Sequence, residues 1–174
     1  GGNNTYRQLL IAGYKTDIDA TCDERFVMPT DTVKANGTEK LSVSIHFYAP
    51  GEYCIGEDAT ADWYLDSWGT EQDYIDMHNG LDKMKKFTKE GHAVIIGEYG
   101  PQSMAKKGVV EFIKEVMVYG HANGMAPMIW NGSIYDRDQK VIVYADIAAM
   151  LAEVTGAKEI PVEEGADNTG APAY

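Results

Sequence analysis

The chain contains four short apolar runs, and each has the length of a buried strand. They span residues 7–14 (RQLLIAGY), 41–48 (LSVSIHFY), 93–98 (AVIIGE) and 125–130 (MAPMIW). The second run alternates apolar and polar positions with the two-residue period of a strand, whereas the third begins with a continuous β-branched stretch typical of a fully buried strand. The pattern therefore predicts four β-strands.

Between these runs, apolar positions recur at helical spacing. Thr70 and Ser103 are each predicted to cap a helix with one apolar face, a third helix is predicted near the end of the chain, and a short one over residues 21–28. Because strands and helices alternate four times, the chain is expected to form a parallel sheet with helices outside. The apolar positions are Tyr74, Met77, Leu81 and Met84 in the first helix, Val109, Phe112, Ile113, Val116 and Met117 in the second, and Ile147, Met150, Leu151 and Val154 in the third.

Two segments lack this periodicity. Residues 49–69 form a long connection rich in Gly, Asp and aromatic residues, and loops of that length are usually functional or mobile. Residues 159–174 carry few large apolar side chains, which predicts a linker or a disordered tail. Residues 1–158 are then expected to form one domain, in agreement with the length of 174 residues.

The composition of the chain argues against some classes of binding partner. The net charge of −12 argues against nucleic acid and against an anionic membrane surface, and it suits a neutral substrate. No run approaches the ~18 apolar residues of a membrane helix, and no charged-then-apolar segment resembles a secretory signal. Cys22 and Cys54 each lack a nearby Cys or His ligand, so they form no metal motif. They are either a disulfide or two free thiols.

Residues capable of chemistry stand at the ends of the predicted strands. The second strand ends with His46 and Tyr48 on one face, the third ends on Glu98, and the fourth ends with Trp130 and Asn131. Because the carboxyl ends of parallel strands form the active site of α/β barrels, we expect these side chains to converge. A carboxylate can attack an anomeric carbon while Tyr and His orient it, and an indole provides an apolar platform for a pyranose ring.

Each residue alone also has an ordinary structural explanation. Glu98 could cap the following loop or pair with an Arg, His46 could be a satisfied core histidine, and Trp130 could be core packing. A carboxylate at the tip of a buried strand is nevertheless costly unless it is paired or hydrogen-bonded. The joint placement of these residues at strand ends therefore favours a sugar-cleaving site.

The motifs SIHFYAP, IIGEYG and MIWNG, in this order and spacing, resemble the sixth, seventh and eighth strands of family 5 glycoside hydrolases. The chain is similar in particular to the endo-β-1,4-glucanases and xyloglucanases of that family, up to about residue 156. This resemblance implies an α/β fold, a (β/α)₈ TIM barrel, of which the chain would supply the last four βα units as a half-barrel. It also implies a secreted enzyme that is retaining, acts in the endo mode and needs no cofactor or metal.

The resemblance also implies roles for individual residues. Glu98 would be the catalytic nucleophile, with His46 and Tyr48 beside it, and Trp130 and Asn131 would belong to the adjacent glucose-binding subsite. Aromatic residues of the long loop would extend the cleft to further sugars. These loop residues are Tyr53, Trp63 and Trp68.

One half of the expected machinery is missing from this sequence. Retaining hydrolysis needs a second carboxylate ~5–5.5 Å from the nucleophile, and in the family this acid/base Glu follows an Asn, yet the chain contains no Asn-Glu pair. We therefore expect an N-terminal half-barrel chain, or a second copy of this chain, as partner besides the β-glucan. A lone half is expected to expose inner-face residues, namely Leu10, Val43, Ile45 and Ile95. The alternatives are a non-catalytic half-barrel that binds glucan or acts as a scaffold, and a β-mannanase or xylanase of the same family.

Overall fold

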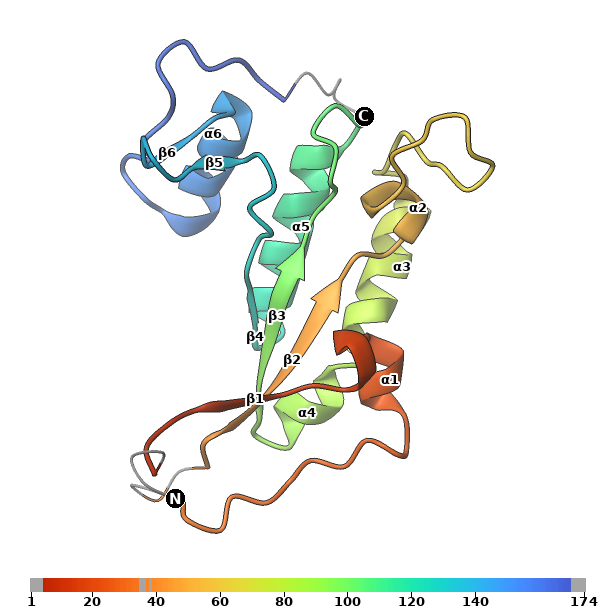
Figure 1. Cartoon of the computed structure of the whole chain (residues 1–174), viewed down its shortest axis with the longest axis vertical. Coiled ribbons are helices and arrows are strands. Elements are labelled where there is room, and N and C mark those ends of the chain that lie inside the picture. The colour runs from red at the N-terminus through yellow and green to blue at the C-terminus, as the bar shows by residue number, and fades with distance from the viewer. Residues whose placement is uncertain (1–4, 35–36, 38, 170–174) are drawn as a thin grey trace.

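The computed structural model describes residues 5–34, 37 and 39–169, and its centre is a four-stranded parallel sheet (Figure 1). The strands are β1 (Leu9–Ile11), β2 (Leu41–Phe47), β3 (Ala93–Tyr99) and β4 (Met125–Pro127), in the order β1-β2-β3-β4. All four predicted strands and their parallel arrangement are confirmed. The fourth strand ends three residues earlier than predicted, at Pro127.

Helices connect these strands. They are η2 (Tyr14–Thr16), α1 (Ile18–Cys22), α2 (Gly51–Cys54), α3 (Glu71–Asp82), α4 (Lys85–Lys89), α5 (Val109–Ala122) and α6 (Ala145–Thr155). A two-stranded antiparallel sheet of β5 (Tyr135–Asp136) and β6 (Val141–Ile142) precedes α6. The predicted cap of α3 is confirmed as a complete capping box, in which Thr70 and Asp73 satisfy each other's backbone N–H groups. In the described part of the chain, no helix has the length and apolar character needed to cross a membrane.

Two predicted helix starts are wrong. The first helix begins at Ile18 rather than near Thr21, because the carboxylate of Asp17 accepts a 2.7 Å hydrogen bond from the backbone N–H of Ala20 and caps it. The helix predicted to begin at Ser103 begins only after Gly108. The preceding residue, Lys107, instead pairs with Ser67 in an isolated parallel bridge.

The predicted tail is ordered over most of its described length. Val162 bridges to Ile142 of β6, and the backbone N–H of Ala145 donates to the carbonyl of Asp167. The N–H and hydroxyl of Thr169 donate to Asp146 at 3.0 and 2.8 Å. Backbone and cap hydrogen bonds therefore hold part of residues 162–169 in place of apolar contacts, and the assignment of residues 159–174 as a linker or a disordered tail stays a prediction. Residues 170–174 lie outside the described residues.

The core lies between one face of the sheet and the helices. Val43, Ile45 and Phe47 of β2 point into it, where Phe47 stacks on Phe112 of α5 and lies against Gly80 of α3. The expectation that Val43 and Ile45 would face the barrel interior is wrong, because odd-numbered residues of β2 face the helices. The opposite, open face of β2 carries small or polar side chains, namely Ser42, Ser44 and His46, and Tyr48 directly after the strand continues this alternation.

Candidate active site

A local irregularity in β3 brings Glu98 to the open face of the sheet. Ile45 of β2 pairs with Ile96, but the next residue, His46, pairs with Glu98, so that Gly97 is an extra residue in β3. Strict alternation would place Glu98 on the same face as Ile96, which is fully buried against the helices. The β-bulge therefore turns the carboxylate toward His46.

Glu98 is held by the side chains of His46 in β2 and of Tyr48, which directly follows β2. Its Oε2 accepts a 2.9 Å hydrogen bond from the hydroxyl of Tyr48 and lies 3.2 Å from Nδ1 of His46. The side chains of Glu98 and His46 are 30% and 32% exposed, so the carboxylate is accessible to a ligand. Burial, together with the hydrogen bond to Glu98, raises the pKa of Tyr48 above its usual range, so the phenol remains a donor at neutral pH. Within the described residues, Oε1 of Glu98 accepts no hydrogen bond and remains available for chemistry.

Trp130 lies beside the same strand end. Its backbone N–H donates to the carbonyl of Tyr99 at 2.9 Å, and its side chain is 51% exposed, as a stacking platform must be. Asn131 follows directly, and its place in the sugar-binding subsite stays a prediction. Its Oδ1 accepts from the N–H of Tyr135 at 2.8 Å and its Nδ2 donates to the carbonyl of Tyr135, so its side chain closes a turn.

Two of the predicted cleft aromatics lie in the core, and their prediction as sugar-binding residues is wrong. The hydroxyl of Tyr53 donates to the carbonyl of Lys107 at 2.9 Å, and its ring is fully buried against Phe112. Trp68 is also fully buried, between Tyr74 and Phe112. The long loop folds back onto its own domain because burying these large aromatic surfaces is strongly favourable.

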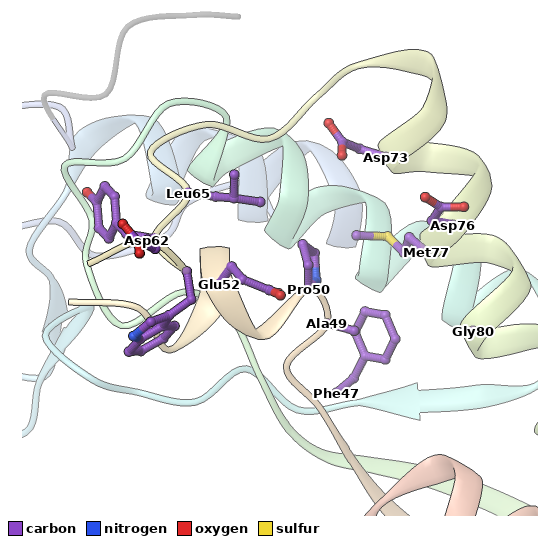
Figure 2. Close-up of a pocket in the computed structure, with 12 residues that line it drawn as sticks. Phe47, Ala49, Pro50, Glu52, Asp62, Leu65, Asp73, Asp76, Met77 and Gly80 are labelled. Carbon is purple, nitrogen blue, oxygen red and sulfur yellow. The ribbon is translucent and has the colours of Figure 1, made fainter. Parts of the chain in front are cut away.

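Trp63 lines a hollow of about 650 Å³ between the long loop and α3. Figure 2 shows Glu52 and Asp62 on the loop side and Asp73 and Asp76 on the α3 side. Neither Glu98 nor the even-numbered residues of β2 line this hollow. Trp63 is 54% exposed in a hollow that Glu98 does not line, and its contribution to the sugar-binding cleft stays a prediction.

A second hollow, of about 540 Å³, adjoins the Glu98 site. Its lining runs from Tyr14 to Ala20 and includes His46 and Tyr48. None of the residues after β1 was predicted to belong to the site. The rule that placed His46, Glu98 and Trp130 at strand ends applies equally to Tyr14, which follows the end of β1.

Lys106 is a further residue that the sequence did not reveal. Its buried ammonium donates to the carbonyls of Tyr53 and Gly56 at 2.6 Å and of Glu52 at 3.3 Å, and it lies 4.3 Å from the centre of the Tyr64 ring. Burial lowers the pKa of Lys106. The side chain caps α2 and ties the loop after Tyr48 to the loop after Glu98.

The two cysteines do not form a disulfide with each other. Cys22 and Cys54 are both free, and burial raises the pKa of each thiol. Cys22 lies 3.9 Å from the sulfur of Met84, and Cys54 is fully buried in the core. No group of three His, Cys, Asp or Glu side chains among the described residues could hold a metal ion.

Comparison with known proteins decides the family. The family described as cellulase (glycosyl hydrolase family 5) matches residues 1–136. The chain belongs to glycosyl hydrolase family 5. The predicted resemblance to this family is thereby confirmed.

Its family 5 relatives are longer proteins. Endoglucanase B of Clostridium cellulovorans is 27% identical over 135 residues, which are 75% of this chain and 28% of that protein. The xyloglucan-specific endo-beta-1,4-glucanase BoGH5A of Bacteroides ovatus is 25% identical over 158 residues, which are 79% of this chain and 30% of that protein. The solved GH5-4 broad specificity endoglucanase from an uncultured bovine rumen ciliate is 29% identical, with a TM-score of 0.75 over 90% of this chain and 50% of that chain.

The family 5 fold explains the open sheet. This chain spans about half of the solved ciliate chain, and its four parallel strands fit half of a (β/α)₈ barrel. The predicted fold class is confirmed. The open face of β2, with His46 and Tyr48, is then the face that looks into the barrel.

Proposed function

We propose that this chain carries the nucleophile and one side of the cleft of a retaining endo-β-1,4-glucanase. The observation that carries the proposal is the carboxylate of Glu98, whose Oε2 accepts a hydrogen bond from Tyr48 and whose side chain is 30% exposed. The endoglucanase and xyloglucanase relatives support β-1,4-glucans as substrates, including cellulose, mixed-linkage glucan and xyloglucan.

In the proposed reaction, Oε1 of Glu98 attacks the anomeric carbon and forms a glycosyl ester while the glycosidic C–O bond breaks. The hydroxyl of Tyr48 keeps the carboxylate oriented, since its raised pKa maintains it as a neutral donor. The half-exposed indole of Trp130 stacks against the ring being attacked. The sugar leaves Glu98 when water attacks the same carbon, which restores the carboxylate.

The leaving oxygen must also be protonated, and this requires a second carboxylate ~5–5.5 Å from Glu98. We propose that an N-terminal half-barrel supplies it. A second copy of this chain could close the sheet in its place, but it has no Asn-Glu pair and would not supply this acid. Within the described strands, β1 and β4 each pair with one neighbour only, so both have free edges where another half can add strands. Exposed Leu10 on β1 would be covered in the same step.

A fluoro-sugar with an activated leaving group tests the nucleophile. We expect 2,4-dinitrophenyl 2-deoxy-2-fluoro-β-cellobioside to esterify Glu98, because dinitrophenolate departs with its electron pair and needs no acid catalyst. Glu98→Gln should abolish labelling, and Glu52→Gln, an exposed Glu elsewhere, should leave it unchanged. Peptide mass spectrometry locates the ester. A label on another residue, or no label even after a first half-barrel from the ciliate endoglucanase has been added, would contradict the proposal.

Sedimentation equilibrium tests the partner. We expect the chain to associate with an added first half-barrel or, without one, with itself. A homogeneous 19.1 kDa monomer that unfolds cooperatively and does not bind the added half-barrel would instead favour a free-standing, non-catalytic half-barrel.

A further inference from the structure

The turn after β1 has an unusual backbone. Lys15 and Thr16 have φ values of +56° and +57°, in the left-handed region that β-branched Thr strongly disfavours. Hydrogen bonds hold the turn from both sides, because the hydroxyl of buried Thr21 accepts from the N–H of Gly13 at 3.2 Å and donates to the carbonyl of Asp17 at 2.6 Å. Residues kept in such conformations concentrate at ligand-binding sites.

This turn forms one wall of the 540 Å³ hollow, and His46 and Tyr48 form the wall nearest Glu98. Tyr14 is 77% exposed, so most of its ring is available to a ligand. The ammonium of Lys15 lies 5.5 Å from the centre of that ring, where it can donate to hydroxyl groups. A large exposed aromatic ring, hydroxyl donors and a neighbouring carboxylate are the features that bind a neutral pyranose.

We propose that Tyr14 is a substrate-contacting, specificity-determining residue that stacks one sugar unit of the glucan in the hollow beside Tyr48. This proposal rests on the proposed glucan-binding cleft and adds to it a subsite on the β1 side. The hollow extends from His46 toward Gly80 of α3 and Lys83, which follows that helix. The sugar in it is either the next unit of the main chain or a branch that projects from the main chain.

Calorimetric titration of the full chain with cellotetraose and with a branched xyloglucan heptasaccharide tests the subsite. We expect Tyr14→Ala to raise the dissociation constant about 2- to 10-fold, which is the change expected from the loss of one aromatic contact. Tyr14→Phe keeps the ring and should bind within about 2-fold of the unaltered chain. Tyr6→Ala is the matched control, because Tyr6 is 68% exposed but lines neither the 540 Å³ hollow nor the 650 Å³ one. If Tyr14→Ala binds both cellotetraose and the heptasaccharide more weakly, the sugar on Tyr14 is a unit of the main chain. If Tyr14→Ala binds only the branched heptasaccharide more weakly, the sugar on Tyr14 is a branch.

Hydroxyl-radical footprinting is a second test of the subsite, and it measures side-chain oxidation in the unaltered chain. Bound heptasaccharide should protect Tyr14 from oxidation and leave Tyr6 unprotected. Equal affinity of Tyr14→Ala and the unaltered chain, without protection, would overturn the subsite. If Trp130→Ala then still weakens binding, the proposed function stands and only this inference fails. If Tyr14 is protected but the fluoro-sugar labels a residue other than Glu98, the subsite stands and the proposed nucleophile fails.

Discussion

The hydroxyl of Tyr48 donates a 2.9 Å hydrogen bond to Oε2 of Glu98, although the two residues are 50 positions apart in the chain. They meet because β2 and β3 are neighbours in the sheet and because the bulge at Gly97 brings Glu98 into register with His46. The orientation of the carboxylate therefore depends on Tyr48 and on His46, whose Nδ1 lies 3.2 Å from the same oxygen, both at the end of the neighbouring strand.

Tyr48→Phe should slow labelling of Glu98 by the activated fluoro-sugar about 10- to 100-fold, since a carboxylate without its donor is held less precisely. The rate constant for appearance of the labelled peptide measures this. Tyr74→Phe, the same change in α3, is the control and should label at the normal rate. An unchanged rate in Tyr48→Phe would mean that the hydrogen bond does not position the carboxylate.

Lys106→Met should lower the free energy of unfolding by about 2–4 kcal/mol, because three carbonyl groups lose their buried donor. Lys107→Met is the matched control, since the neighbouring side chain is exposed and only its backbone contacts the long loop. The control should change stability by less than ~0.5 kcal/mol. Urea unfolding of both variants measures the difference, and equal midpoints would show that the ammonium does not stabilise α2.

Gly108→Ala should be strongly destabilising for two reasons. Gly108 has φ of +77°, and an added Cβ would lie 1.8 Å from the carbonyl oxygen of Trp68, so the loop or helix α5 must shift. Gly156→Ala has a similar φ of +68° with no atom within 4 Å, and it should cost only the ~1–2 kcal/mol of the left-handed conformation. Thermal unfolding measures the difference between the two variants. Equal losses would show that contact with Trp68 is unimportant.

The chain should lose stability in alkaline solution. Burial raises the pKa of Tyr53, Tyr99 and Cys54 in the folded state, so the unfolded chain releases these protons first as the pH rises. The stability that these groups contribute is complete below their unfolded pKa values of about 8.5–10 and falls above them. The free energy of unfolding measured between pH 7 and 10.5 should therefore decrease, and a flat profile would contradict the assignment.

Tyr99→Phe and Tyr53→Phe separate burial from hydrogen bonding in this effect. Both should reduce the alkaline loss, but their stabilities at pH 7 should differ. The hydroxyl of Tyr99 has no hydrogen-bond partner among the described residues, so its removal should be neutral or stabilising. Tyr53 donates to the carbonyl of Lys107, so its removal should cost about 0.5–1.5 kcal/mol. The reverse order would contradict the hydrogen-bond pattern.

Local patterns in the sequence were enough to predict the four parallel strands and the presence of helices α3, α5 and α6. The two-residue alternation of β2 predicted that His46 and Tyr48 share a face, and the Thr70–Asp73 pair specified where α3 begins. The strand-end rule predicted that Glu98 and Trp130 lie at the same edge of the sheet, and the hydrogen bond from the N–H of Trp130 to the carbonyl of Tyr99 agrees with that position. These features depend on the geometry of a few consecutive residues, which sequence spacing records directly.

Only the tertiary structure decided which face Glu98 takes, which loop aromatics are buried, and what surrounds Lys106. The bulge at Gly97 depends on pairing with a strand 50 positions away, and the burial of Tyr53 and Trp68 depends on contact with Phe112 of α5. The periodicity of apolar residues predicts the type of an element and which residues share a face, but not what that face packs against. Register and burial depend on the free energy of packing together elements that are distant in the sequence. The spacing of neighbouring residues does not determine that free energy.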